Sequence, residues 1–282
     1  MRLNPFDASK INVGGGGGGG FPGGAGGGIG CGTLVIALIG ALVFGIDPTS
    51  MLGGMQGTTA PVEQTGSPQS AQELCTQNAY ATEACNALQS LNETWEPAFN
   101  AANIPFRQPR LYFISGGQVN TACGGASSAM GPFYCPGDQT MYIDTAFYDQ
   151  LQRQLGAGGD FARYYVIAHE YGHHIQTITG VADQIRSAQG QNPRAANQLQ
   201  IRMELQADCY AGVWAGKNRN LIEPGDFEEG MNAASAIGDD RLTGGRVSSE
   251  NFTHGTSAQR SEALRRGMQS GDDTVCDAYV QG

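Results

Sequence analysis

The stretch VIAHEYGHHIQ, residues 166–176, contains three of the four histidines in a chain of 282 residues. His169 and His173 are four residues apart, so on an α-helix they lie on nearly the same face and can bind one metal ion together. His174 is turned about 140° from His169 on that helix and is expected to miss the metal. Glu170 can reach a water molecule at the metal without being a ligand, which is the H-E-x-x-H arrangement.

These residue types are the ones that zinc-dependent hydrolysis requires. Zn²⁺ favours imidazole and carboxylate ligands, and a catalytic site keeps one position open for water. The metal lowers the pKa of that water, and Glu170 would act as general base and deliver the proton to the leaving amine. Asp160 and Gly180 are expected to begin and end the helix. The alternative is a pair of structural histidines on a core helix.

A third protein ligand has to come from elsewhere, and the candidates are His254, Asp183, Glu204 and Asp208. Glu204 and Asp208 are four apart in the largely apolar stretch IRMELQADCYAGVWAG, residues 201–216. Burying both carboxylates is costly unless a metal ion and a histidine N–H compensate their charge. We expect Glu204 to be the third ligand of one zinc ion per chain, and Asp208 to accept a hydrogen bond from the far nitrogen of a ligand histidine. The two roles could be exchanged, or the pair could be exposed to solvent.

Charge and cysteine content limit the partners and the compartment. The net charge of −10 argues against nucleic acid, because phosphate binding needs a basic surface. Six of the seven cysteines follow the glycine-rich N-terminal region, and this even number predicts disulfides in an oxidising compartment. Reduced thiols in a cytosolic protein are the alternative. The sequence does not fix the pairing, but we favour three pairs, the first two of which close short loops: Cys75–Cys85, Cys123–Cys135 and Cys209–Cys276.

The N-terminal part predicts a membrane anchor. Residues 28–46 contain no charged side chain and are about long enough for a helix to cross a bilayer. Arg2 and Lys10 precede them and Asp47 follows, so the positive-inside rule places residues 1–27 in the cytoplasm and the remainder outside. We therefore expect a single-pass membrane protein with its N-terminus inside. A cleaved signal peptide is the alternative.

The rest of the chain divides into a polar linker, residues 47–70, and a domain, residues 71–282. Apolar spacing predicts helices first, then short strands rich in aromatic and β-branched residues, and then further helices. This order predicts an α+β fold, a small sheet followed by helices. The expected helices are 71–101, 144–155, 161–179, 196–214, 224–237 and one capped by Thr256 or Ser257; the expected strands are 110–115, 131–135 and 139–144.

With these motifs in place, the sequence resembles the bacterial putative neutral zinc metallopeptidases of the YpfJ type. The resemblance is carried by the N-terminal apolar segment and by GPFYCPGDQTMYID, VIAHEYGHHIQ, RMELQADCYAGVWAG and HGTSAQR. It implies a zincin-like domain held at the bacterial cytoplasmic membrane and facing the periplasm or another extracytoplasmic space. The helix-borne Glu204 with Asp208 is similar to gluzincin metalloproteases. In zincins the strand before the metal helix commonly binds the peptide, so part of residues 131–144 could do this.

The leading hypothesis is a membrane-anchored zinc endopeptidase that acts on proteins or peptides. A donor for the tetrahedral oxyanion would come from His254 or Tyr210, and His254 has the stronger motif context. Capping of the last helix is an alternative role for His254. A non-catalytic binding or chaperone-like module of the envelope, stabilised by structural zinc, is the main alternative function. A zinc amidase acting on peptide cross-links of the cell wall is another.

Overall fold

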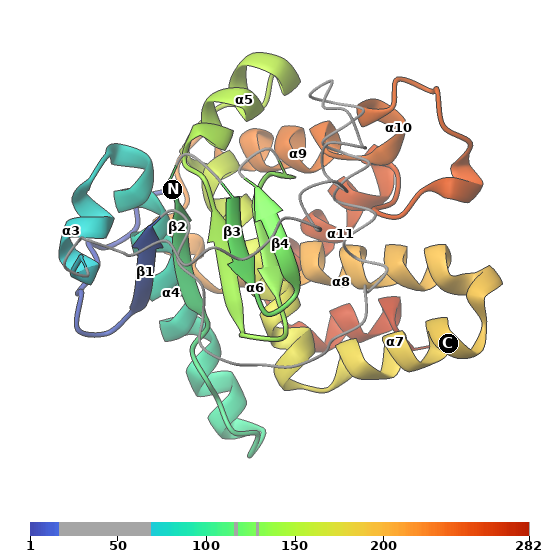
Figure 1. The fold of residues 1–282 in the computed structure, drawn as a ribbon, viewed down its shortest axis with the longest axis horizontal. Helices are drawn as coiled ribbons and strands as arrows, with labels where there is room; N and C mark the ends of the chain where they lie inside the picture. Colours follow the sequence, from blue (N-terminus) through green and yellow to red (C-terminus); the bar gives the residue numbers. More distant parts are fainter. Residues whose placement is uncertain (17–68, 116–117, 128–129, 282) are drawn as a thin grey trace, which may run out of the picture.

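The computed structural model describes residues 1–16, 69–115, 118–127 and 130–281, and its architecture is α+β, as predicted. The strands lie towards the front and left of the view in Figure 1, with helix α6 behind them and α8 and α11 to the right. The strands are β1 (Asn12–Gly16), β2 (Arg110–Ile114), β3 (Gln118–Thr121), β4 (Gly124–Ser127), β5 (Phe133–Cys135) and β6 (Thr140–Ile143). The helices are α3 (Ala71–Thr76), α4 (Ala79–Ala101), α5 (Ala146–Leu155), α6 (Asp160–Ile178), α7 (Val181–Gln191), α8 (Ala196–Lys217), α9 (Asp226–Ala236), α10 (Asp239–Leu242) and α11 (Ser257–Ser270).

The main sheet has the strand order β1-β2-β6-β5. Strands β1, β2 and β6 are parallel, and β5 runs antiparallel to β6 at one edge. The three predicted strands correspond to β2, β5 and β6. The β3–β4 hairpin forms a separate two-stranded sheet, which the disulfide Cys123–Cys135 connects to β5.

Most predicted helices are present, and two differences concern α7 and the start of α6. Helix α7 was not predicted, because its only well-buried residues are Ala182 and Ile185 and its apolar stripe is short. Asp160 is the first residue of α6 rather than its N-cap, which is Gly159. Helix α11 begins as expected after Thr256, whose side chain forms a capping box with Gln259.

Helices α8 and α11 pack with their backbones in direct contact. A Cβ added to Gly212 of α8 would lie 2.1 Å from the carbonyl oxygen of Leu264, and one added to Gly267 of α11 would lie 2.1 Å from that of Cys209. Only glycine allows this approach. The contact fixes the position of α11 along α8.

The six cysteines of the domain form the three disulfides expected from the sequence, Cys75–Cys85, Cys123–Cys135 and Cys209–Cys276. Two of them close loops of 10 and 12 residues, and the third spans 67 residues and connects α8 to the C-terminal 3₁₀ helix Asp273–Tyr279. All six side chains except Cys123 are fully buried. The disulfides therefore brace both the start of the domain and its end.

The N-terminal region differs from the expectation of a separate segment. Residues 1–16 pack on the domain, and β1 is a strand of its main sheet. The predicted membrane segment, residues 28–46, lies outside the described residues, as does the linker up to residue 68. Within the described ranges, no helix is both long enough and apolar enough to span a bilayer.

The contact between α8 and α11 generates a prediction about stability. Gly212→Ala would force a methyl group into the backbone of α11 and should lower the free energy of unfolding by about 1–3 kcal/mol. Gly190→Ala is the matched control, because a Cβ at Gly190 in α7 meets nothing within 4 Å. Chemical denaturation of both variants measures the difference. Equal stability of the two would contradict the close packing of α8 and α11.

Candidate metal centre

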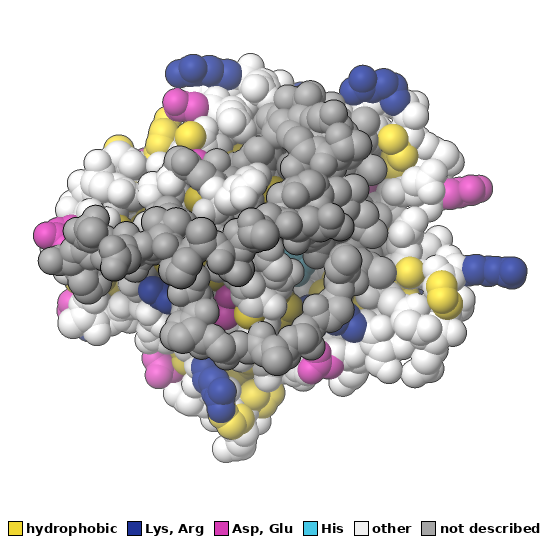
Figure 2. Space-filling view, in the orientation of Figure 1, with side chains coloured by type: hydrophobic (Ala, Val, Ile, Leu, Met, Phe, Trp, Pro, Cys, Tyr) yellow, Lys and Arg dark blue, Asp and Glu magenta, His cyan; other side chains and the backbone are white. Residues whose placement is uncertain are grey.

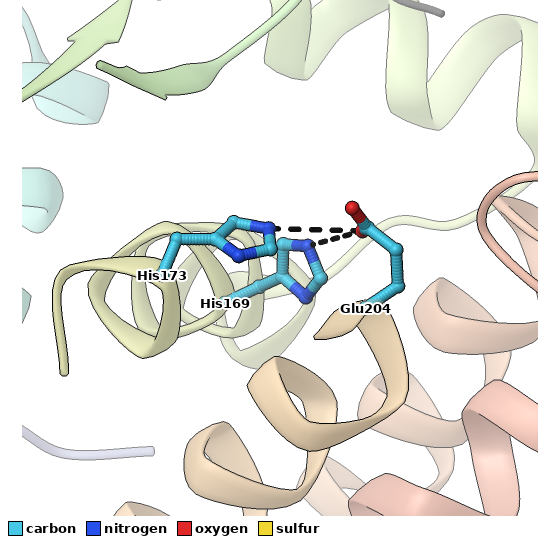
Figure 3. A group of neighbouring side chains, drawn as sticks. All are labelled: His169, His173 and Glu204. Atoms are coloured by element: carbon cyan, nitrogen blue, oxygen red, sulfur yellow. Dashed lines mark ion pairs between the residues drawn. The ribbon is translucent and has the colours of Figure 1, made fainter. Parts of the chain in front are cut away.

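Helix α6 presents His169 and His173 on one face, and helix α8 presents Glu204 opposite them (Figure 3). The Nε2 atoms of His169 and His173 are 3.2 and 3.7 Å from one carboxylate oxygen of Glu204. One ligand atom from each of the three residues lies within 4.8 Å of the others. The three ligands expected from the sequence are therefore brought to a common point.

This donor set fits a zinc ion. Ligand atoms at 2.0–2.1 Å from a tetrahedral zinc ion are about 3.3 Å apart, which matches the observed separations. The His169 and Glu204 side chains are only 8% and 7% exposed. A carboxylate buried to this extent needs a compensating cation, and three protein ligands leave one tetrahedral position open.

Each ligand histidine is oriented through its other ring nitrogen. Nδ1 of His169 lies 2.8 Å from Oδ1 of Asp208, and Nδ1 of His173 lies 2.9 Å from Oε1 of Gln176. Both partners are acceptors, so both Nδ1 atoms carry the proton and both Nε2 lone pairs are free for a metal. The Gln176 amide is fixed in turn, because its Nε2 donates to the Met203 carbonyl.

A missing side chain on α6 allows α8 to come close enough. A Cβ added to Gly172 would lie 2.8 Å from the Cα atom of Ala207 and 2.9 Å from its carbonyl oxygen. Ala207 is next to Asp208 and three residues after Glu204. The glycine inside the HEYGHH motif thus permits the approach that places Glu204 and Asp208 against the histidines.

The comparisons with known proteins agree with this geometry. The family model of the putative neutral zinc metallopeptidases matches residues 4–279. The chain belongs to this family. It is 43% identical to the uncharacterized protein YpfJ of Escherichia coli strain K12 over 252 residues, which is 87% of this chain and 85% of that one. It is also 43% identical to the uncharacterized protein Rv2575 of Mycobacterium tuberculosis strain H37Rv over 206 residues, 67% of each chain. No solved structure matches it.

The electrostatics of this candidate metal site show an excess of negative charge. Burial opposes the charging of His169, but the carboxylates of Asp208 and Glu204 outweigh it and raise the pKa of His169 to about 10. Burial would raise the pKa of Glu204, yet the neighbouring His173 and His169 hold it well below its usual range. The site therefore collects positive charge, as protons or as a metal ion.

Glu170 is available for proton transfer. It is 9% exposed, and burial raises the pKa of its carboxyl group. Among the described residues it takes part in no hydrogen bond or ion pair. A carboxylate that is neither a ligand nor engaged elsewhere can exchange a proton with a water molecule beside the metal.

His254 lies near the metal ligands, and its positive form would lower the pKa of Glu204. Nδ1 of His254 is 3.1 Å from Oδ1 of Asp239, and the backbone N–H of His254 donates to Oδ2 of the same carboxylate at 2.7 Å. The sequence analysis did not identify Asp239, because nothing in the local pattern relates it to a residue fifteen positions later. Tyr210, the other candidate oxyanion donor, packs edge-on against Trp95 in the hydrophobic core instead.

His174 points away from the metal, as its helix position predicted, but it is completely buried. Its Nε2 donates to the carbonyl oxygen of Arg107 at 2.6 Å, and its Nδ1 accepts from the hydroxyl of Tyr134 at 3.0 Å. Burial lowers the pKa of His174 to about 4, which keeps the ring neutral. His174 therefore joins the metal helix to β5.

A second group of potential ligands, Asp160, Asp226 and Glu229, is partly compensated. The α-amino group of Met1 donates to Asp226 at 2.7 Å and to Asp160 at 3.0 Å. Asp183, which the sequence analysis considered as a ligand, is 85% exposed and pairs with Arg186. Of the two groups found among the described residues, only the one with His169, His173 and Glu204 combines imidazole ligands with a carboxylate.

Gln176 generates the prediction for this site. Gln176→Leu removes the acceptor for Nδ1 of His173, so the zinc dissociation constant should rise about 10–100-fold. Gln184→Leu, an exposed substitution on α7, is the control and should bind zinc like the parent chain. Competition with a chromogenic chelator measures both. An unchanged zinc affinity in Gln176→Leu would show that His173 needs no orienting partner.

Proposed function

We propose that this member of the family is a zinc-dependent endopeptidase that cleaves proteins or peptides outside the cytoplasm. The observation that carries the proposal is the joint placement of two imidazoles and one carboxylate as ligands, with the free carboxylate of Glu170 beside them. The three disulfides support an oxidising compartment.

The metal ligands and Glu170 would have separate roles in peptide hydrolysis. When bound to His169, His173 and Glu204, zinc supplies a Lewis acid that polarises the scissile carbonyl and lowers the pKa of water. Glu170 accepts the proton of the attacking water and transfers it to the leaving amine. Burial raises the pKa of the Glu170 carboxyl group, because it disfavours the charged carboxylate, and so helps Glu170 to hold the proton between the two transfers.

His254 would stabilise the negative charge that develops on the carbonyl oxygen. The contacts of Nδ1 and of the backbone N–H with Asp239 fix the imidazole, and because Nδ1 donates to this carboxylate, Nε2 can donate to the substrate only from the imidazolium form. A donor fixed in advance costs no reorganisation during the reaction. Its position near Glu204 supports this role.

Strand β5 would align the substrate. It is the edge strand next to the metal helix, and the bond between Tyr134 and His174 connects it directly to α6. An extended peptide can pair with such an edge as an added strand. On the face drawn in Figure 2, the charged side chains of the described residues are scattered around the rim with both signs interspersed. We expect main-chain pairing with β5 to contribute to substrate binding.

A structural zinc site is less well supported. Structural sites usually have four protein ligands, whereas the group formed by the described residues offers three. A purely structural site also has no use for a buried and unpaired carboxylate beside the metal.

Glu170→Gln tests the mechanism. The variant should retain one zinc ion per chain, because Glu170 is not a ligand, and its kcat/KM on unfolded casein should fall about 10²–10⁴-fold. Glu250→Gln, at an exposed position, is the matched control. Metal analysis and cleavage assays are needed together. Full activity in a zinc-loaded Glu170→Gln variant would remove Glu170 from the mechanism. A zinc-free and inactive parent chain would remove the proposed function itself.

A further inference from the structure

Arg260 is a buried arginine beside the metal ligands. Its side chain is 2% exposed, although it carries a full charge. Nε donates to Oδ2 of Asp208 at 2.8 Å, and Nη2 donates to Oδ1 at 2.9 Å, so the guanidinium holds the carboxylate with two parallel bonds. Nη2 also lies 3.2 Å from the hydroxyl of Tyr165, which itself donates to Asp208 at 2.6 Å.

These bonds determine how Asp208 meets His169. The carboxylate is completely buried, and without a cation its charge would be uncompensated. Arg260 and Tyr165 hold both of its oxygens, and Oδ1 is left pointing at Nδ1 of His169. A carboxylate that is free to rotate would lose this alignment, and the Nε2 lone pair of His169 would no longer be directed at the metal.

We propose that Arg260 is a positioning residue of the metal centre. It acts through Asp208, fixing the orientation of His169 and balancing the charge of the carboxylate that orients it. The arginine ends the HGTSAQR motif, so the motif contributes His254 to one side of the centre and Arg260 to the other. This inference rests on the proposed metal site and adds a third helix, α11, to it.

Arg260→Met should raise the zinc dissociation constant about 10–100-fold, because the partner that orients a ligand is released. Arg260→Lys keeps the charge but cannot form two parallel hydrogen bonds to the carboxylate. Its zinc dissociation constant should therefore lie between those of Arg260→Met and the parent chain. The control is Arg163→Met. Arg163 of α6 forms a comparable arginine–carboxylate pair between helices, with Glu83 of α4, but it does not touch a metal ligand or the partner of one. Zinc affinity and thermal stability are measured for all three variants.

A merely structural arginine at position 260 would lower stability and leave zinc affinity unchanged, as we expect for Arg163→Met, and this result would overturn the proposal. If Arg260→Met does not fold, the comparison of Arg260→Lys with the parent decides, since an unchanged affinity and an unchanged absorption spectrum of the Co²⁺-substituted protein would also overturn it. Absence of zinc binding in the parent chain would instead contradict the proposed function.

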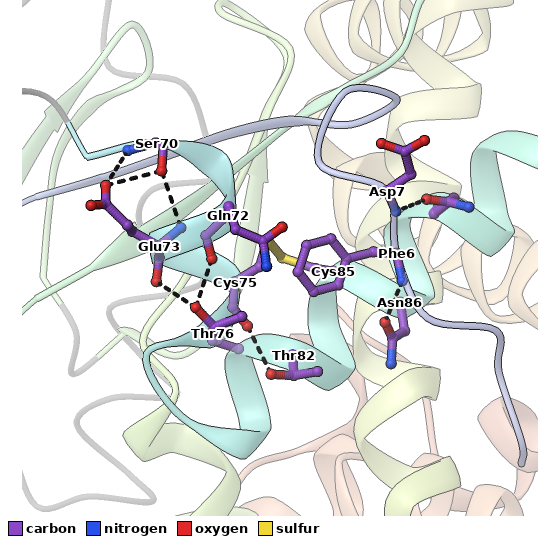
Figure 4. Close-up of a disulfide and its surroundings, with 12 residues drawn as sticks. Phe6, Asp7, Ser70, Gln72, Glu73, Cys75, Thr76, Thr82, Cys85 and Asn86 are labelled. Carbon is purple, nitrogen blue, oxygen red and sulfur yellow. Dashed lines mark hydrogen bonds between the residues drawn. A yellow bond between two sulfur atoms is a disulfide. The ribbon is translucent and has the colours of Figure 1, made fainter.

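A second inference comes from the N-terminal residues, which are built into the domain. Strand β1 pairs in parallel with β2 over five residues, from Asn12 with Arg110 to Gly16 with Ile114. The backbone N–H of Phe6 donates to Asn86 at 2.9 Å, and Phe6 lies beside the disulfide Cys75–Cys85 (Figure 4). Ile11 is buried in the core of the domain.

The glycines of β1 serve this packing. A Cβ on Gly14 would overlap the side chain of Arg110, and one on Gly15 would lie 2.5 Å from Leu74. The positive-inside rule places Arg2 in the cytoplasm. In the structure, Nη2 of Arg2 lies 3.2 Å from Oε1 of Glu223 in the domain. The N-terminal charge therefore has a partner within the fold.

Residues 1–16 are packed into the same folded unit as the domain, and one folded unit cannot lie on both sides of a bilayer. We infer that residues 1–16 and 69–281 lie on the same side of any membrane that the protein contacts. This inference differs from the expectation that the N-terminal residues lie in the cytoplasm and the domain lies outside it.

Cysteine labelling tests this arrangement in bacterial cells that produce the full chain. In a Cys31→Ser background, Ser9→Cys and Ser187→Cys place single thiols at exposed positions of the N-terminal segment and of α7. A membrane-impermeant maleimide should label both in intact spheroplasts, or both only after permeabilisation. Labelling of one from outside and of the other only after permeabilisation would overturn the inference. Either outcome leaves the proposed peptidase chemistry untouched.

Discussion

The contact between α6 and α8 at Gly172 and Ala207 is the constraint on which the metal centre depends. Zinc ligation tolerates errors of only about 0.2 Å in ligand distance, and two separate helices must supply the ligands. With the backbone of Ala207 at the surface of Gly172, Glu204 reaches the two histidines at 3.2 and 3.7 Å. Any side chain at position 172 would separate the helices by more than that tolerance. The distances between the ligand atoms are thus set by the packing of the two helix backbones.

The charges of the centre are matched to a dication. With Glu170 ionised, three buried carboxylates (Glu170, Glu204 and Asp208) and the guanidinium of Arg260 leave a net charge of −2. Zn²⁺ cancels this charge. In its absence protons take its place, which is why the pKa of His169 rises to about 10 despite its burial. Metal binding must then displace protons, so the centre should bind zinc more weakly as the pH falls.

The sequence predicted the features that depend on local spacing. The i, i+4 relation of His169 and His173 required only a helix, and the apolar context of Glu204 and Asp208 indicated a buried acidic pair. The residues that orient the ligands could not be predicted, because nothing in their local sequence distinguishes them from other polar residues. Gln176 is one more polar residue on α6 until the Met203 carbonyl fixes its amide. Strand β1 could not be predicted, because its glycines show no alternation of apolar residues. Their role, which is to leave room for the side chains of Arg110 and Leu74, depends on the three-dimensional packing.

The segment between α10 and α11 shows how few residues are needed to complete such a site. His254 and Arg260 are six residues apart, yet one meets Asp239 and the other meets Asp208. Gly255, with φ of +87°, turns the chain between them, and the capping box of Thr256 starts α11 at once. Because α11 lies directly on α8 at Gly212, this start is fixed relative to Asp208. A displacement of α11 would therefore disturb the imidazole and the guanidinium together, so the proposed oxyanion donor His254 and the orientation of His169 are coupled through one short stretch of backbone.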